Sequence, residues 1–239
     1  MTKKILITGA NGQLGHEMRN ALKGNNRFEC IFTDVAELDI CNTEAVKQTM
    51  ANNHIDYIVN CAAYTQVDKA EDNAELCKKI NTDAVENLAR AAADYGARMI
   101  HISTDYVFNG RGYRPYTEDM VPDPQSVYGS TKLEGEKILT DICPESIIIR
   151  TAWLYSPYGN NFVKTMLHLG EEREELSVVA DQIGTPTCAA DLAQAILVIL
   201  QADTFVPGTY HFSDEGVCSW YDFTVTIHRL AGITTCRVT

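Results

Sequence analysis

Alternating strand-like and helix-like segments constrain the fold of this 239-residue chain more than any other feature. Runs rich in β-branched residues are separated by longer segments of helical period, for example at 13–23 and 43–51. The strand-like runs are KKILITG, ECIFTD, DYIVNC, RMIHIS and SIIIRT. Continuous apolar strands covered by amphipathic helices predict a doubly wound α/β fold with a parallel sheet buried on both faces. A closed eight-fold barrel is the alternative, but its strands should recur more evenly.

Beyond residue 151 the alternation loosens, which predicts a second and smaller unit. We expect a Rossmann-type domain over residues 1–150, with return elements at about 188–214 that comprise the helix DLAQAILVIL and the strand GTYHFS. Residues 151–187 and 215–239 should form a smaller lobe laid over the cleft. Within that lobe the sequence predicts a charged helix at GEEREEL, a strand at LSVVAD and a turn at QIGTPT.

Charge and cysteine usage exclude several classes of protein. The net charge of −12 argues against a nucleic-acid partner, because phosphate-backbone binding needs clustered Lys and Arg. The eight cysteines contain no CxxC pair and several lie in apolar runs, so we expect no metal site, no disulfide and a reducing, cytoplasmic location. No apolar stretch approaches membrane-spanning length, and the first strand follows two lysines without a secretory apolar region.

A glycine cluster follows the first strand-like run. TGANGQLG places Gly9, Gly12 and Gly15 where a strand turns into a helix, so that the backbone can approach a pyrophosphate on the free amides of that helix. A tightly packed turn without a ligand is the alternative, and the position after the first strand favours the dinucleotide. Asp34 closes the second run, where an acid would bond a ribose 2′-hydroxyl and repel a 2′-phosphate, or would simply cap a turn.

The ends of the later strands should meet at the same edge of the sheet, where open α/β folds bind ligands. The positions expected to border the adenine and the central ribose are Asp39, Ile40, Ala62, Ala63 and Tyr64. The fourth run delivers Thr104 and Asp105, and a hydroxyl there can hydrogen-bond a carbonyl oxygen as charge develops on it. Ordinary loop and capping chemistry is the alternative for each of these residues.

Tyr128 and Lys132 stand four residues apart in DPQSVYGSTKLEGEK. If Asp123 caps a helix that Pro124 opens, the two side chains share one face. A nearby ammonium favours the phenolate of a tyrosine, whose free pKa is about 10, and so suits the pair to acid/base chemistry. The alternative is a packed ring beside a solvated charge.

Together these motifs resemble a known family over nearly the whole chain. TGANGQLG, NCAAY followed by TQVDKAE, STDYVFNG, the YxxxK pair, RTAWLY, GNNFVKTM and DQIGTPT are similar to the extended short-chain dehydrogenase/reductase superfamily, and within it to the dTDP-4-dehydrorhamnose reductase family. Related nucleotide-sugar dehydratases carry an acid after the Thr-Asp pair. Tyr106 occupies that position here, which argues against dehydration.

The resemblance implies a mechanism and a set of site residues. Tyr128 would protonate the C4 ketone of dTDP-6-deoxy-L-lyxo-4-hexulose while NADPH or NADH delivers hydride, giving dTDP-L-rhamnose. Lys132 would lower the tyrosine pKa and hold the nicotinamide ribose, and Thr104 would polarise the ketone or tune the phenol. The glycine-turn residues Asn11, Gln13 and Leu14 would join the cofactor site. Asp105 and Trp153 would hold the sugar, although core packing is an equal alternative for the indole.

The resemblance also leaves alternatives open. Asp34 without an adjacent arginine favours NADH, whereas the family accepts NADPH and often NADH. A non-catalytic regulatory subunit, similar to that of methionine adenosyltransferase, is a second reading, and reduction of another nucleotide 4-keto sugar is a third. A homodimer is compatible with the sequence. Since the family normally continues for several tens of residues beyond CRVT, the resemblance implies a substrate-binding lobe that is incomplete at its C-terminus and captures substrate more weakly.

Overall fold

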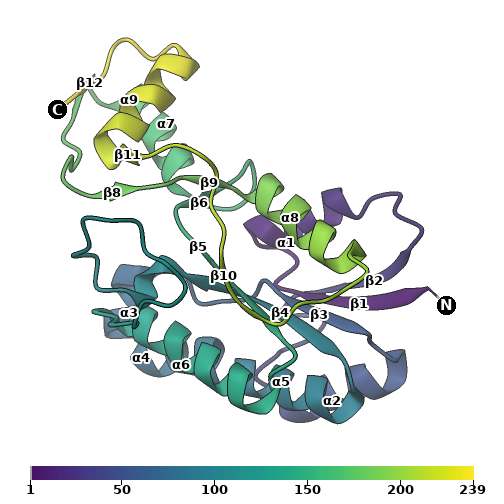
Figure 1. The fold of residues 1–239 in the computed structure, drawn as a ribbon. Coiled ribbons are helices and arrows are strands. Elements are labelled where there is room, and N and C mark those ends of the chain that lie inside the picture. The colour runs from purple at the N-terminus through teal and green to yellow at the C-terminus, as the bar shows by residue number, and fades with distance from the viewer. Residues whose placement is uncertain (1) are drawn as a thin grey trace.

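In the computed structural model, which describes residues 2–239, a six-stranded sheet in the order β10-β5-β4-β3-β1-β2 forms the centre of the molecule (Figure 1). Every neighbouring pair in it is parallel. The strands are β1 (Lys3–Thr8), β2 (Phe28–Thr33), β3 (Tyr57–Asn60), β4 (Arg98–Thr104), β5 (Ile147–Thr151) and β10 (Gly208–His211). The predicted doubly wound α/β fold is confirmed, and the strand GTYHFS returns to the main sheet beside β5.

Helices cover both faces of this sheet (Figure 1). One face carries α1 (Gln13–Ala21) and α8 (Ala189–Gln201), which pack against each other, and the other carries α2 (Thr43–Asn53), α5 (Ala84–Tyr95) and α6 (Val127–Ile142). The short helices α3 (Val67–Asp72) and α4 (Ala74–Lys78) and a π-helical turn (Lys79–Asp83) lead into α5. The order in which successive strands are added to the sheet reverses between β1 and β3, and open α/β sheets bind ligands at this switch point.

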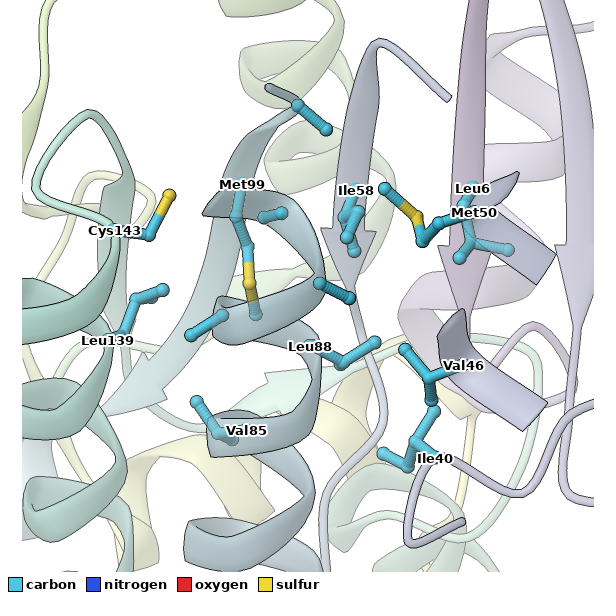
Figure 2. Packing of buried hydrophobic residues seen from close by; sticks show 14 of the residues in the cluster. Leu6, Ile40, Val46, Met50, Ile58, Val85, Leu88, Met99, Leu139 and Cys143 are labelled. Carbon is cyan, nitrogen blue, oxygen red and sulfur yellow. The ribbon is translucent and has the colours of Figure 1, made fainter. Parts of the chain in front are cut away.

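Burial alternates residue by residue between two apolar cores, as a sheet covered on both faces requires. Leu6, Ile58 and Met99 pack beneath α2 and α5 with Val46, Met50 and Leu88 (Figure 2). Their strand neighbours, among them Ile5, Val59 and Ile100, join the second core beneath α1 and α8. Because each strand residue is committed to one face, the register of the sheet is fixed.

The remaining elements form a smaller unit beyond β5 (Figure 1). Helices α7 (Phe162–Glu172) and α9 (Trp220–Ala231) enclose a core of their own around Met166, Leu176 and Ile227. Three short strand pairs complete it: β6 (Leu154–Tyr155) with β9 (Thr187–Cys188), β7 (Glu175–Leu176) with β12 (Arg237–Val238), and β8 (Ile183–Gly184) with β11 (Cys218–Ser219). No helix in the described part of the chain is long and apolar enough to cross a membrane.

Helix α6 begins later than the sequence predicted. Its N-cap is Ser126, whose hydroxyl accepts a hydrogen bond from the Gly129 amide. Asp123 is engaged elsewhere, because its amide donates to the Val107 carbonyl and its carboxylate accepts from Asn109. The prediction of an Asp123 cap and a Pro124 start was therefore wrong, but Tyr128 and Lys132 still lie within the helix.

The prediction for GEEREEL and LSVVAD was also wrong. Helix α7 begins after the N-cap Asn161 and ends at Glu172, because Arg173 adopts extended backbone angles. The following Glu175–Leu176 pairs with Arg237–Val238 near the end of the chain, and the rest of LSVVAD forms no ladder of its own. A pairing between segments so far apart in sequence overrides the local helical preference of a charged stretch.

Helix α6 contains a glycine that its packing requires. A Cβ on Gly135 would lie 2.3 Å from the Asn81 carbonyl oxygen of the π-helical turn. We expect Gly135→Ala to lower the free energy of unfolding by about 1–3 kcal/mol through overpacking, although alanine is the better helix former by about 1 kcal/mol. Urea denaturation measures this, with the exposed Ser130→Ala in the same helix as a control that changes stability by no more than about 0.5 kcal/mol. A Gly135→Ala protein as stable as the wild type contradicts the prediction.

Candidate functional site

The glycine turn between β1 and α1 brings three backbone segments into contact. Gly9 has a left-handed φ of 64°, and a Cβ there would lie 2.6 Å from the Ala62 amide nitrogen. A Cβ on Gly15 would lie 2.3 Å from the Gly9 carbonyl oxygen, so this glycine is required for packing within the turn. Gly12 is the N-cap of α1, and no side chain caps the helix there. The amides of the first turn are therefore open to an anion, as the dinucleotide prediction requires.

A cavity of about 530 Å³ opens beside this turn. The Asp34 carboxylate stands at its edge, where it accepts a hydrogen bond of 2.9 Å from the Asn11 amide. Eight of the predicted cofactor residues line the cavity: Gly9, Asn11, Gly12, Asp34, Asp39, Ile40, Ala62 and Ala63. Leu76, Lys79 and Ile80 close another part of it, and the sequence offered no motif for them. Apolar walls, an open helix N-terminus and the carboxylates of Asp34 and Asp39 fit the adenosine and pyrophosphate of a dinucleotide.

Three further predicted residues do not line this cavity, and their side chains or backbones make other contacts. Leu14 is buried in the core beneath α1. Gln13 turns toward the smaller unit, where its Oε1 accepts from the Asn161 side chain at 2.9 Å and from the Ser156 hydroxyl at 3.3 Å. Tyr64 packs beside Tyr128, and its backbone amide and carbonyl both bond the side chain of Asn81. Gln13 thus ties the glycine turn to the segment that precedes α7.

Tyr128 and Lys132 occupy consecutive turns of α6 and are both buried, Lys132 to within 1 % of full burial. The phenol packs edge-to-face against Tyr106 at 5.5 Å between ring centroids, and the Thr104 side chain interacts with it. The Lys132 ammonium position is fixed from the opposite side: Nζ lies 2.6 Å from the Ile102 carbonyl and 3.2 Å from His101 Nε2. The structure therefore brings the predicted Thr104, Tyr128 and Lys132 together at the end of β4.

The electrostatics of the pair differ from the expectation. Burial raises the pKa of Tyr128 above its ordinary value, and the Thr104 side chain only partly opposes this. Burial also lowers the pKa of Lys132 to about 8, against the opposing effect of Glu136. Lys132 does not lower the tyrosine pKa here, because its nitrogen is directed to β4. A phenol held in its neutral form is a proton donor, which is the state that reduction of a ketone requires.

A second cavity, of about 470 Å³, lies between β5 and the smaller unit. Asp105 lines it, and burial raises the pKa of this carboxyl to about 6 against a hydrogen bond from Thr104. Arg150 and His211 also line it, and within the described residues Arg150 Nη1 and His211 Nε2 have no hydrogen-bond partner. Since buried polar atoms are normally paired, these two atoms lack partners that a polar ligand could supply. Tyr128 lines neither cavity, but Thr104 beside it ends β4, and in the sheet β4 stands between β3, whose end leads to the first cavity, and β5, whose end lines the second.

Trp153 is held in an aromatic stack rather than in the wall of that cavity. Its backbone φ is 48°, which is unusual for a residue with a large side chain. Its indole stacks on that of Trp220, with 3.4 Å between the ring centroids and 10° between the ring planes. A Cβ on Gly184 would lie 2.4 Å from the same indole. The stack joins the end of β5 to the first residue of α9, so Trp153 borders the second cavity through its neighbours Ala152 and Gly184.

Several site residues were missed by sequence reasoning. Glu136 forms a buried ion pair with Arg150, with contacts of 3.0 and 2.7 Å, and this pair fixes the second cavity's guanidinium. His101 is fully buried and touches Lys132. A signal for each was present, because Glu136 follows Lys132 by one helical turn and His101 interrupts an apolar strand. Neither signal identifies a partner without the three-dimensional arrangement.

The fold and site define a Rossmann-fold dinucleotide-binding protein with the tyrosine and lysine pair of short-chain dehydrogenases and reductases. The chain belongs to the family described as RmlD substrate binding domain, which it matches over residues 3–239. It is 46% identical to a dTDP-4-dehydrorhamnose reductase of Escherichia coli K12, over 96% of this chain and 79% of that protein. The structure of such a reductase from Clostridium acetobutylicum superposes with a TM-score of 0.95 at 51% identity, over 99% of this chain and 82% of the other. The structure of such a reductase from Bacillus anthracis, in complex with NADP, superposes with a TM-score of 0.95 at 42% identity, over 100% of this chain and 84% of the other.

The Gln13 contacts predict a measurable coupling between the glycine turn and the smaller unit. We expect Gln13→Leu to accelerate amide hydrogen exchange in residues 154–161 about tenfold, because hydrogen bonds worth about 1 kcal/mol or more are lost there. Exchange in the central strands should not change. Gln48→Leu, an exposed position on α2, is the matched control. Unchanged exchange at 154–161 shows that Gln13 does not hold this segment.

Proposed function

We propose that the chain is a dTDP-4-dehydrorhamnose reductase, which reduces the C4 ketone of dTDP-6-deoxy-L-lyxo-4-hexulose to give dTDP-L-rhamnose. The observation that carries the proposal is that Tyr128 stands beside Thr104 at the end of β4, the strand between β3, which leads to the cavity suited to a dinucleotide, and β5, which lines the second cavity. The names of the most similar proteins support the substrate. The NADP complex of the Bacillus anthracis protein supports a nicotinamide cofactor.

In this mechanism the chain holds the cofactor and supplies one proton. The open backbone amides of Gln13 and Leu14 in the first turn of α1 would bind the pyrophosphate, Gly9 and Gly12 would let it approach, and Asp34 would accept from the adenosine ribose of NADH or NADPH. The nicotinamide, when bound, supplies the hydride. Tyr128 Oη donates its proton to the ketone oxygen, and Thr104 Oγ1 orients the phenol and the carbonyl for this step. Lys132 would hold the nicotinamide ribose.

The second cavity would receive the sugar nucleotide, and the smaller unit formed by 151–187 and 215–239 would serve as the substrate lobe. Asp105 follows Thr104 in the chain, accepts a hydrogen bond from its hydroxyl and lines the cavity. Its carboxylate would therefore bond sugar hydroxyls next to the reacting ketone. Arg150 and His211 line the same cavity, and the unpaired Arg150 Nη1 and His211 Nε2 would bond polar groups of the substrate. Trp153 would contribute through its stack with Trp220, which positions the lobe over the cavity.

Turnover tests this function against a purely regulatory role. We expect the protein to oxidise NADPH or NADH when the dTDP 4-keto sugar is added, and Tyr128→Phe to lower kcat by about 10²–10⁴-fold without weakening cofactor binding, because only the proton donor is lost. Tyr95→Phe, an exposed tyrosine on α5, is the control and should behave as wild type. Absence of turnover by the wild-type protein would favour a regulatory subunit, and faster turnover of another nucleotide 4-keto sugar would change the substrate.

Asp105 predicts a pH dependence of substrate binding. Its carboxyl has a pKa raised to about 6, so it is protonated at lower pH and ionised above that value. If the carboxylate accepts sugar hydroxyl hydrogen bonds, the KM for the sugar nucleotide should fall about tenfold as the pH rises through about 6, since charged hydrogen bonds contribute about 1.5 kcal/mol or more. The KM for the cofactor should stay constant. Asp105→Asn should show a high KM at every pH, and a wild-type KM that does not respond to pH contradicts this role.

A further inference from the structure

The chain between β4 and α6 forms part of the wall of the second cavity. We call residues 109–118 of this segment the cavity loop, and they form neither helix nor strand. Residues 112–116 of the loop line the cavity. From 110 to 118 every residue except Tyr116 is exposed. A segment that buries so little surface needs specific contacts to hold it in one place.

His211 binds the cavity loop at two points. It lies on β10, the edge strand of the sheet. The Phe212 amide donates to the Arg150 carbonyl of β5, so the preceding His211 amide faces away from the sheet. There it donates to the Glu118 carboxylate at 2.9 Å, while His211 Nδ1 lies 3.2 Å from the Tyr116 carbonyl oxygen. A carbonyl can only accept, so Nδ1 carries a hydrogen and donates it to the loop.

Aromatic and backbone contacts fix the part of the loop that lines the cavity. The Tyr116 ring stacks on Phe108, with 4.4 Å between the ring centroids and 3° between the ring planes. The Tyr116 hydroxyl accepts from the Gly112 amide at 3.1 Å. Between these two residues, Pro115 has a fixed φ and restricts the backbone of Arg114 to extended angles. The backbone of Arg114 is therefore held from both sides.

Arg114 brings an uncompensated positive charge to the cavity. Its guanidinium lies over the Tyr113 ring, 5.4 Å from the centroid, and forms no ion pair within residues 2–239. The other arginine in the wall, Arg150, is paired with Glu136. Among the described residues, Asp105 is the only carboxylate in the wall. A free cation at this place attracts an anionic ligand, which the net charge of −12 would otherwise repel.

We propose that Arg114 binds the diphosphate of the sugar nucleotide, and that His211 and Glu118 are positioning residues that hold Arg114 at the cavity. The identity of the ligand rests on the proposed function. A guanidinium offers two parallel N–H donors to phosphate oxygens, so arginine suits this group better than lysine. Glu118 carries a negative charge, but it promotes the binding of an anion because it orders the loop that carries Arg114.

Binding of dTDP, measured by isothermal titration calorimetry without cofactor or turnover, tests the role of Arg114. We expect Arg114→Gln to weaken dTDP binding about tenfold, because a charged hydrogen bond is lost, and Arg114→Lys to restore part of the affinity. Arg111→Gln is the matched control, since Arg111 is exposed in the same loop but does not line the cavity, and it should bind dTDP as the wild type does. Equal affinities of Arg114→Gln and wild type overturn the proposal, as does an equal loss in Arg111→Gln or a wild-type protein that does not bind dTDP.

Glu118→Ala tests the positioning role, because charge alone predicts the opposite result. Removal of a negative charge would by itself strengthen dTDP binding. We expect binding to weaken about threefold to tenfold instead, since the loop loses its bond to the His211 amide. Asp119→Asn removes the neighbouring charge and should not weaken binding. In the Arg114→Gln background, Glu118→Ala should have no further effect, because it acts through Arg114. Additive effects, or a Glu118→Ala protein that binds dTDP as tightly as the wild type, overturn the positioning role.

The outcomes separate this inference from the proposed reductase activity. A protein that does not oxidise NADPH or NADH, but loses dTDP affinity in Arg114→Gln, supports the inference and contradicts the reductase function. In a protein that turns over, Arg114→Gln should raise the KM for the sugar nucleotide and leave the KM for the cofactor and kcat unchanged. Turnover with an unchanged KM for the sugar nucleotide in this variant supports the reductase function and overturns the inference.

Discussion

The candidate site depends on backbone segments that approach one another so closely that only glycine, which has no Cβ, fits between them. Gly9 meets Ala62 at the β1 end, and Gly129 meets the Tyr106 carbonyl, where an added Cβ would lie 2.2 Å away. Gly135 lies further along α6 and makes the same kind of close contact with the π-helical turn. The contacts of Gly129 and Gly135 hold α6 close to the turn at Asp105–Val107, which follows β4, and to the π-helical turn. This close approach brings the phenol of Tyr128 beside Thr104 at the end of β4.

The energetic consequence is a site built largely from buried polar groups. Lys132, Glu136 and Arg150 are each nearly inaccessible, and removing such charges from water costs several kcal/mol apiece. The bidentate pairing of Glu136 with Arg150 and the bonds of Lys132 to β4 offset that cost. A site arranged in this way is set before any ligand arrives, since its side chains have few alternative partners.

Much of the architecture was readable from the sequence, because strand and helix periods are local properties. The parallel sheet, the glycine turn and the helix that carries Tyr128 and Lys132 all follow from patterns within a few residues. The start of α6 did not, since Asp123 and Ser126 are both good N-caps and only the contacts of Asp123 with Val107 and Asn109 decide between them. The pairing of Glu175–Leu176 with Arg237–Val238 and the direction of the Tyr128 pKa shift depend on distant neighbours and on burial, which no local pattern records.

The stack of Trp153 on Trp220 has a practical consequence. The chain contains two tryptophans, and both lie in this one contact between the end of β5 and α9. The tryptophan fluorescence of the protein therefore comes entirely from the contact between the end of β5 and α9. Any rotation of the smaller unit relative to the sheet would separate or shift the two indoles. The tryptophan emission would therefore change with that movement.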